Sequence, residues 1–175
     1  METIIKILGT YEIITNLIPG ILFYLLAPPE FRLLLNINNF VFLLAFCYFV
    51  GLILNRMGSL LLSPIAQHVG FVKYAPYDQF LKAEKVEQSK DEHKLQTLLM
   101  VNNFYRTLCA MIISLIAVRV YYSPLTCNTF LFQISLNNWI YWGLFLLFLF
   151  SYKKQVAFIK NRVESIKEDD FNEPY

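Results

Sequence analysis

The chain has 175 residues, of which 57% are hydrophobic and only 16% charged, with a formal net charge of +2. Soluble domains usually carry about 25% charged residues, so the composition excludes an ordinary water-facing globule, and the net charge gives no argument for nucleic-acid binding. Uncharged runs of 17, 23 and 33 residues cover Ile13–Pro29, Leu33–Asn55 and Val120–Tyr152. A helix needs roughly 20 apolar residues to cross a bilayer. We therefore expect an all-α integral membrane protein.

Four membrane spans are predicted in chain order: Ile13–Ala27, Asn39–Leu62, Leu98–Tyr122 and Asn138–Tyr152. The first does not look like a signal peptide, because it lacks a basic start and a small-residue cleavage site. In the third, Arg106 and Arg119 bracket twelve uncharged residues, and we expect each arginine to extend toward one membrane surface. A two-span alternative would place this segment in a soluble core that the polar remainder is too small to supply.

The distribution of basic residues predicts the orientation. With four spans, both termini and the central segment share one side, which holds 13 of the 15 basic residues. These are Lys6, Arg56, Lys73, Lys82, Lys85, Lys90, Lys94, Arg106, Lys153, Lys154, Lys160, Arg162 and Lys167. The positive-inside rule then places that side in the cytoplasm. The expected location is the bacterial inner membrane, with both termini cytoplasmic.

This topology divides the chain into four segments. Residues 1–63 hold an N-terminal surface helix and spans one and two, 64–97 a cytoplasmic helical segment, 98–152 spans three and four, and 153–175 a cytoplasmic tail. Pro19-Gly20 interrupts the first helical pattern, which leaves open whether Thr3–Asn16 lies on the membrane or crosses it. The predicted fold is a four-helix membrane bundle with a short cytoplasmic helical segment between spans two and three.

The cytoplasmic segment carries its own helix signal. Asp78 is the expected N-cap, and the mixed charges of Gln79–Lys94 are typical of a solvated helix face. Four apolar residues at helical spacing accompany these charges: Phe80, Leu81, Ala83 and Val86. We expect this stripe either to pack on the bundle or to bind a partner.

Small and polar residues recur along one face of the second span and of the third. The candidates are Cys47, Gly51, Asn55, Ser59 and Ser63 on the second, and Asn103, Thr107 and Ser114 on the third. Such faces allow close helix packing, and they would also suit the lining of a water-filled pore in a homo-oligomer. Two arginines near the cytoplasmic ends of these spans, Arg56 and Arg106, are charge candidates, because ionisable residues at membrane depth are often functional. The alternative is that they only anchor the helices.

No residue pattern predicts catalysis, a cofactor or a metal site. Of the three cysteines, Cys47 and Cys109 fall in apolar segments and only Cys127 in a loop, so no disulfide framework is expected. His68 and His93 lack a second pair of ligands, and the six glycines do not cluster. We expect a protein that is not an enzyme.

Four short stretches resemble a known family. They are Tyr-Glu-Ile-Ile-Thr-Asn-Leu-Ile-Pro-Gly at 11–20, Asn-Arg-Met-Gly-Ser-Leu at 55–60, Asn-Asn-Phe-Tyr-Arg-Thr-Leu at 102–108 and Ser-Tyr-Lys-Lys-Gln at 151–155. The chain is similar here to small four-span bacterial membrane proteins, some of which are accessories to type VI-B CRISPR systems with an RNA-guided RNA-cleaving effector. The resemblance implies a role in antiviral defence. The Arg-x4–6-His pair of a second accessory family is absent from this sequence, so we expect no intrinsic RNA cleavage.

Two hypotheses of function follow. In the first, the protein is a homo-oligomeric accessory or effector that perturbs or permeabilises the membrane as a pore or channel. In the second, it is a membrane scaffold or sensor whose Tyr77–Leu99 segment recruits or regulates a soluble cytoplasmic effector without conducting. The expected partners are the lipid bilayer, further copies of the chain and a soluble defence effector, with no direct nucleic-acid contact. An intramembrane enzyme has no supporting set of residues.

Overall fold

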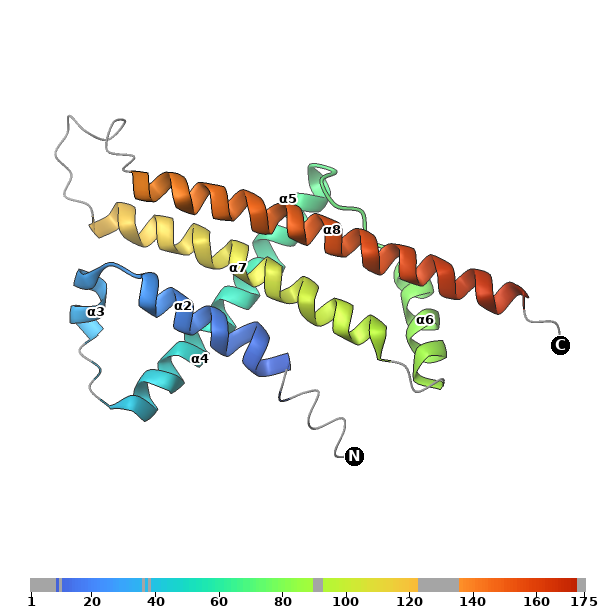
Figure 1. Ribbon diagram of the computed structural model, residues 1–175, viewed down its shortest axis with the longest axis horizontal. Coiled ribbons are helices and arrows are strands. Elements are labelled where there is room, and N and C mark those ends of the chain that lie inside the picture. The colour runs from blue at the N-terminus through green and yellow to red at the C-terminus, as the bar shows by residue number, and fades with distance from the viewer. Residues whose placement is uncertain are drawn as a thin grey trace.

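The computed structural model describes residues 9, 11–35, 37, 39–89, 93–122 and 136–172. All regular secondary structure within these ranges is helical, which confirms the all-α prediction for this part of the chain. Figure 1 shows the arrangement. The elements are η1 (Ile13–Leu17), α2 (Ile18–Leu26), α3 (Pro29–Leu35), α4 (Phe40–Met57), η2 (Gly58–Leu62), α5 (Ser63–His68), α6 (Tyr77–Ser89), α7 (Lys94–Tyr122) and α8 (Leu136–Asn172), where η denotes a π-helix.

Three helical runs are long and apolar enough to cross a membrane. They cover Phe40–His68, Lys94–Tyr122 and Trp139–Ile166 and contain the cores of predicted spans two, three and four. Each is 28 or 29 residues long, or about 42 Å at 1.5 Å per residue. They therefore exceed the roughly 30 Å thickness of a hydrocarbon core.

The first predicted span is a bent element. Ile13–Leu26 is helical, but Ala27 is extended and α3 then leaves at 112° to the preceding helix. The prolines at positions 28 and 29 explain the break, because a residue before proline avoids the α conformation. Ile13–Leu26 alone is about 21 Å long. This pair makes a fourth span only if its two arms are counted together.

Both π-helical segments immediately precede a proline-containing helix start. Pro19 follows η1 and Pro64 follows η2, each in the first turn of the next α-helix. Proline has no N–H to donate and crowds the carbonyl four residues earlier. A wider π turn accommodates this without breaking the helix, and Ile13–Leu26 continues through Pro19-Gly20 as one run. Tyr11 and Glu12 are helical and lead directly into this run, and residues 1–8 and 10 lie outside the described ranges.

The core is organised around α7. Of the 18 most apolar consecutive residues of α7, 39% are buried. The same share is 17% in the run Phe40–His68 and 22% in the run Trp139–Ile166. One hydrophobic cluster joins α7 to α2 and α4 through Phe23, Leu54 and Ile112. A second joins α7 to α5 and α8 through Cys109, Ala66 and Val156. Helix α7 is thus the central helix.

A third cluster lies at the end of the molecule that carries α6. Ala83 of α6 and Leu95 of α7 pack there against Ile159, Val163 and Ile166 of α8. We call α6, the first turn of α7 and the last turns of α8 the α6 unit. Figure 1 shows it at the opposite end of the molecule from α3. Helix α8 runs unbroken over 37 residues from Leu136 to Asn172, through the predicted fourth span and the described part of the predicted tail.

Candidate functional site

A chain of hydrogen-bonded side chains passes between the apolar helices and converges on Arg106 of α7. Its first arm begins at Glu12, just before η1. The Glu12 carboxylate accepts hydrogen bonds from the Tyr48 hydroxyl at 2.9 Å and from the Asn16 amide. Asn55 Nδ2 of α4 donates to Asn16 Oδ1 at 2.9 Å, and Arg106 Nη2 donates to Asn55 Oδ1 at 3.3 Å. Three helical segments are joined by this arm.

The second arm leads from Arg106 to α5 and α8. Arg106 Nη1 donates to Ser63 Oγ at 3.5 Å, and Ser63 Oγ lies 3.2 Å from the Tyr152 hydroxyl. The Tyr152 hydroxyl also bonds to that of Tyr74. Tyr152 has no exposed surface, so its hydroxyl depends on these partners for hydrogen bonding. The two arms together are called the arginine network below.

The π-helical segments position this network. Asn16 belongs to η1, and Ser63 directly follows η2. Gly58, the first residue of η2, lies against Arg106: a Cβ atom there would come within 3.1 Å of Arg106 Cγ and 3.2 Å of its carbonyl oxygen. Any larger residue would therefore crowd the arginine stem. Single π turns inside α-helices are frequent at functional sites because they redirect side chains.

The charge of Arg106 is compensated indirectly. Its described hydrogen-bond partners, Asn55 and Ser63, are neutral, and its buried Nε has no partner among the described residues. Glu12 is connected to it through Asn16 and Asn55. An incompletely paired cation among apolar helices is costly. Such a group is the strongest functional candidate among the described residues of these helices.

The small residues of α4 pack against η1 and α2 at backbone contact. A Cβ atom added to Gly20 would lie 1.8 Å from the carbonyl oxygen of Cys47, and one added to Gly51 would lie 1.8 Å from that of Asn16. Neither position can hold a side chain without separating the helices. Close approach of this kind is the usual use of small residues between membrane helices.

The remaining sequence candidates occupy different environments. Thr107 is fully buried and donates to the Asn103 carbonyl oxygen at 2.8 Å, while Asn103 Nδ2 donates to the Tyr11 hydroxyl at 2.9 Å. Ser114 Oγ lies 4.0 Å from the Met57 sulfur, and Ser59 is half-buried. Of the candidates predicted from the sequence, the structure brings Asn55, Ser63 and Arg106 together through hydrogen bonds.

Arg56 lies apart from the arginine network. It neighbours Asn55 in sequence, but its side chain is exposed on the outer surface of α4. The two arginines singled out from the sequence thus have opposite surroundings.

Arg119, predicted from the sequence only to extend toward one membrane surface, forms a second arginine site. Arg119 Nη2, near the end of α7, donates to the carbonyl oxygen of Leu26 at 3.1 Å and to the Tyr141 hydroxyl at 2.8 Å. Its guanidinium carbon also lies 4.6 Å from the centre of the Tyr141 ring. Arg119 therefore caps the last turn of α2 and links it to α7 and α8.

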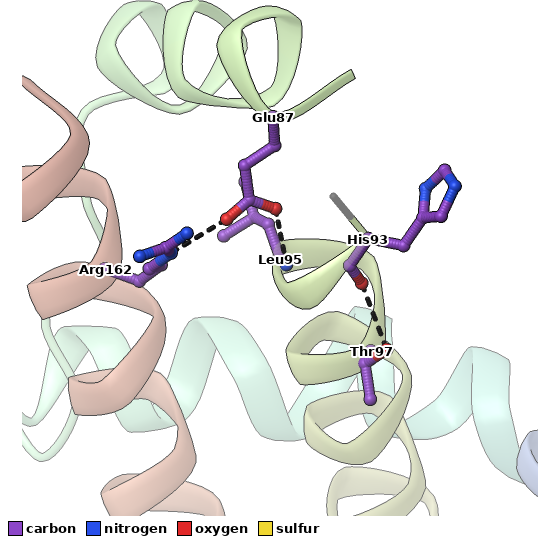
Figure 2. A network of polar contacts seen from close by, with 5 residues as sticks. All are labelled: Glu87, His93, Leu95, Thr97 and Arg162. Atoms are coloured by element: carbon purple, nitrogen blue, oxygen red, sulfur yellow. Dashed lines mark hydrogen bonds and ion pairs between the residues drawn. The ribbon is translucent and has the colours of Figure 1, made fainter. Parts of the chain in front are cut away.

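A buried carboxylate holds the α6 unit together (Figure 2). Glu87 of α6 is 4% exposed; its Oε1 accepts from Arg162 Nε of α8 at 2.8 Å, and its Oε2 accepts from the backbone N–H of Leu95 at 2.8 Å. The second bond satisfies one of the free N–H groups at the start of α7, where the helix dipole also favours a negative charge. Glu87 thus joins three helices. Apart from the mixed charges of α6, no sequence pattern indicates this pairing.

The described residues contain no group of three or more His, Cys, Asp or Glu side chains that could hold a metal ion. Comparisons with protein-family models, with curated proteins and with solved structures find no match to this chain.

Proposed function

We propose that this chain is a multi-pass membrane protein whose α6 unit faces the cytoplasm. The three long apolar runs support the membrane location, as do the large exposed hydrophobic side chains along them, such as Phe49, Leu60 and Leu147. In water such a surface would drive aggregation. The excess of Lys and Arg on the side that holds the α6 unit supports the orientation.

Within that topology, the protein is a non-enzymatic scaffold that recruits or regulates a soluble cytoplasmic effector. The observation that carries this proposal is the inward direction of the polar groups: Asn16, Asn55 and Ser63 bond to Arg106 or to each other inside a single chain. They are therefore already used in packing. The antiviral setting, with an RNA-guided effector as the partner, is carried over from the family resemblance.

The α6 unit supplies a surface for such a partner. Ala83 is buried against α7 and α8, and Phe80 and Val86 are partly buried there, so most of the stripe seen in the sequence packs on the other helices. Its outer side exposes Asp78, Lys82 and Lys85. Charged, solvated faces steer the encounter of soluble proteins. We place the recruiting surface on these lysines.

A second candidate function, membrane perturbation by an oligomer, is favoured by Arg56. An ionisable side chain within an apolar span almost always faces a neighbouring helix or water, yet Arg56 is exposed on the single chain. Assembly around this face of α4 would give Arg56 a partner or a water-lined path. In this candidate the lining comes from Arg56 and its neighbours on the outer surface.

Two measurements on the full-length protein separate these candidates. The first is the fraction of a co-expressed type VI-B effector that sediments with membranes, in wild type and in the charge-reversed pair Lys82→Glu/Lys85→Glu. Lys73→Glu/Lys154→Glu carries the same change in net charge at exposed positions outside the α6 unit and is the matched control. We expect at least a five-fold loss for the α6 pair and wild-type behaviour for the control.

The second measurement is dye release from vesicles that contain the purified chain at increasing density. The scaffold proposal predicts that vesicles stay sealed at every density, and that Arg56→Gln changes nothing. Density-dependent release that Arg56→Gln abolishes would replace it with the second candidate. If the vesicles stay sealed and the α6 substitutions leave the sedimenting fraction of the effector unchanged, both candidate functions are contradicted.

A further inference from the structure

An apolar groove opens between α5, α7 and α8, with a volume of about 430 Å³. All eleven side chains that line it are apolar. Its floor is formed by two buried small residues, Ala66 and Ala110, and its rim includes Ile65 and Ile113, which are 61% and 43% exposed. Small residues below large exposed ones create a hollow on the outer surface. The volume falls in the range of ligand-binding pockets, about 300–1,000 Å³.

A cation closes one end of this groove. Phe145, Leu149 and Lys153 follow one another at intervals of four residues on α8, so they share one face of the helix, and the first two line the groove. The ammonium of Lys153 lies 4.6 Å from the centre of the Phe71 ring, and Phe71 is itself a lining residue. The groove thus leads from apolar side chains to an exposed lysine. Two further exposed lysines are neighbours in the sequence: Lys154 directly follows Lys153, and Lys73 lies two residues after Phe71.

We propose that this groove binds an anionic phospholipid of the inner leaflet, with one acyl chain between α5 and α8 and the phosphate at Lys153. The inference rests on the membrane location and orientation of the proposed function. In a bilayer an unfilled apolar hollow loses dispersion contacts, so an acyl chain occupies it. Charge complementarity selects the headgroup, because basic sites at the cytoplasmic ends of membrane helices bind acidic lipids.

The Phe71 ring orients this lysine. Its position under the ammonium restricts Lys153 to the groove side of α8 and leaves the remaining N–H groups for the phosphate. Lys160 lies seven residues further along the same helix but forms an exposed pair with Glu164 at 3.5 Å. It is therefore a matched lysine outside the groove.

The test is native mass spectrometry of the purified full chain in detergent, titrated with phosphatidylglycerol or phosphatidylcholine. We expect one tightly bound phosphatidylglycerol per chain and about five-fold weaker binding for Lys153→Gln, which removes one cation near the membrane surface. Lys160→Gln should bind as wild type does. Ile113→Trp fills the groove and should abolish binding. Ile53→Trp, at a site 44% exposed and outside the groove, should not.

Other results would overturn the proposal. Equal binding of the two lipids, or binding unaffected by Lys153→Gln, means that the groove takes hydrocarbon without headgroup selection. A change of oligomeric mass in Ile113→Trp without loss of lipid means that a second copy covers the groove. No effector is present in this lipid-binding assay. A negative result therefore contradicts the lipid site but does not affect the sedimentation test of effector recruitment. Failure to insert into membranes, measured by carbonate extraction, would instead remove the proposed function itself.

Discussion

Arg106 of α7 donates a hydrogen bond to the side-chain oxygen of Asn55 of α4 over 3.3 Å. Asn55 uses its own amide nitrogen to bond Asn16, so one side chain joins a cation to a third helical segment. A small neutral amide therefore carries the connection between α7, α4 and η1. Loss of this side chain would therefore affect the contacts of all three elements.

Replacing Asn55 by alanine should destabilise the helix assembly by about 1–3 kcal/mol, because it leaves buried hydrogen-bonding groups of Arg106 and Asn16 without a partner. The measurement is the free energy of unfolding of the full chain in mixed detergent micelles. Ser59→Ala, in η2 of the same helical run and half-buried, is the control and should change stability by less than about 0.5 kcal/mol. Equal effects of the two substitutions would mean that the arginine network contributes nothing specific.

Alanine at Gly20 or Gly51 should also destabilise, for a steric reason. The added methyl group would lie 1.8 Å from a carbonyl oxygen of the crossing segment, so the helices must separate, at a cost of about 1–3 kcal/mol or more. Gly143 has no atom within 4 Å of the equivalent position. Gly143→Ala should therefore be neutral or stabilise α8 by up to about 1 kcal/mol. Thermal unfolding followed by circular dichroism distinguishes the two signs.

Removing the charge of Glu87 should loosen the α6 unit before the rest of the molecule. Glu87→Gln weakens a bond to Arg162 and the cap of α7, with an expected loss of about 1.5–3 kcal/mol. Faster hydrogen exchange at the Leu95 amide is the direct measurement, since Glu87 accepts its N–H. Glu164→Gln breaks a pair whose side chains are 40% and 53% exposed and should cost less than about 1 kcal/mol.

The orientation can be tested with single cysteines in a chain from which Cys47, Cys109 and Cys127 have been removed. Leu34→Cys, in α3 where the side chain is 74% exposed, should react with a membrane-impermeant maleimide in intact spheroplasts. Lys82→Cys, on the exposed side of α6, should react only after permeabilisation. The reverse pattern would invert the proposed topology.

The sequence was a good guide to the long helices but a poor one to their ends. Charge-free runs predicted the apolar segments because hydrocarbon excludes ionisable groups. Charge places the end of the fourth predicted span at Tyr152, and α8 continues as a helix beyond this point to Asn172. A buried face with a spacing of three and four residues accompanies this part of the helix: Val156, Ile159, Val163 and Ile166. That spacing was readable in the sequence and was outweighed by the lysines.

The candidate site was predicted only in part. Helical periodicity relates residues within one helix and predicts Asn55 and Ser63 on the face of span two, whereas Arg106 is predicted separately as an ionisable residue at membrane depth. Tyr74 and Tyr152 could not be added this way, since their hydroxyls meet only after the 69–76 loop and α8 pack together. The π turns also escaped prediction, although Pro19 and Pro64 mark both of them. A π turn differs from an α turn by a shift of one residue in the backbone hydrogen bond, and the amino-acid composition of a helix does not reveal this shift.

Helix α8 extends for 37 residues, which corresponds to a rod of about 55 Å. One end lies near the α3 end of the molecule and the other carries the α6 unit (Figure 1). A rigid rod of that length acts as a lever: a change in tilt of about 10° displaces its far end by about 10 Å. Helices tilt to match bilayer thickness, so in the proposed membrane location a change in bilayer thickness would move the end of α8 that carries the α6 unit and, with it, Glu87.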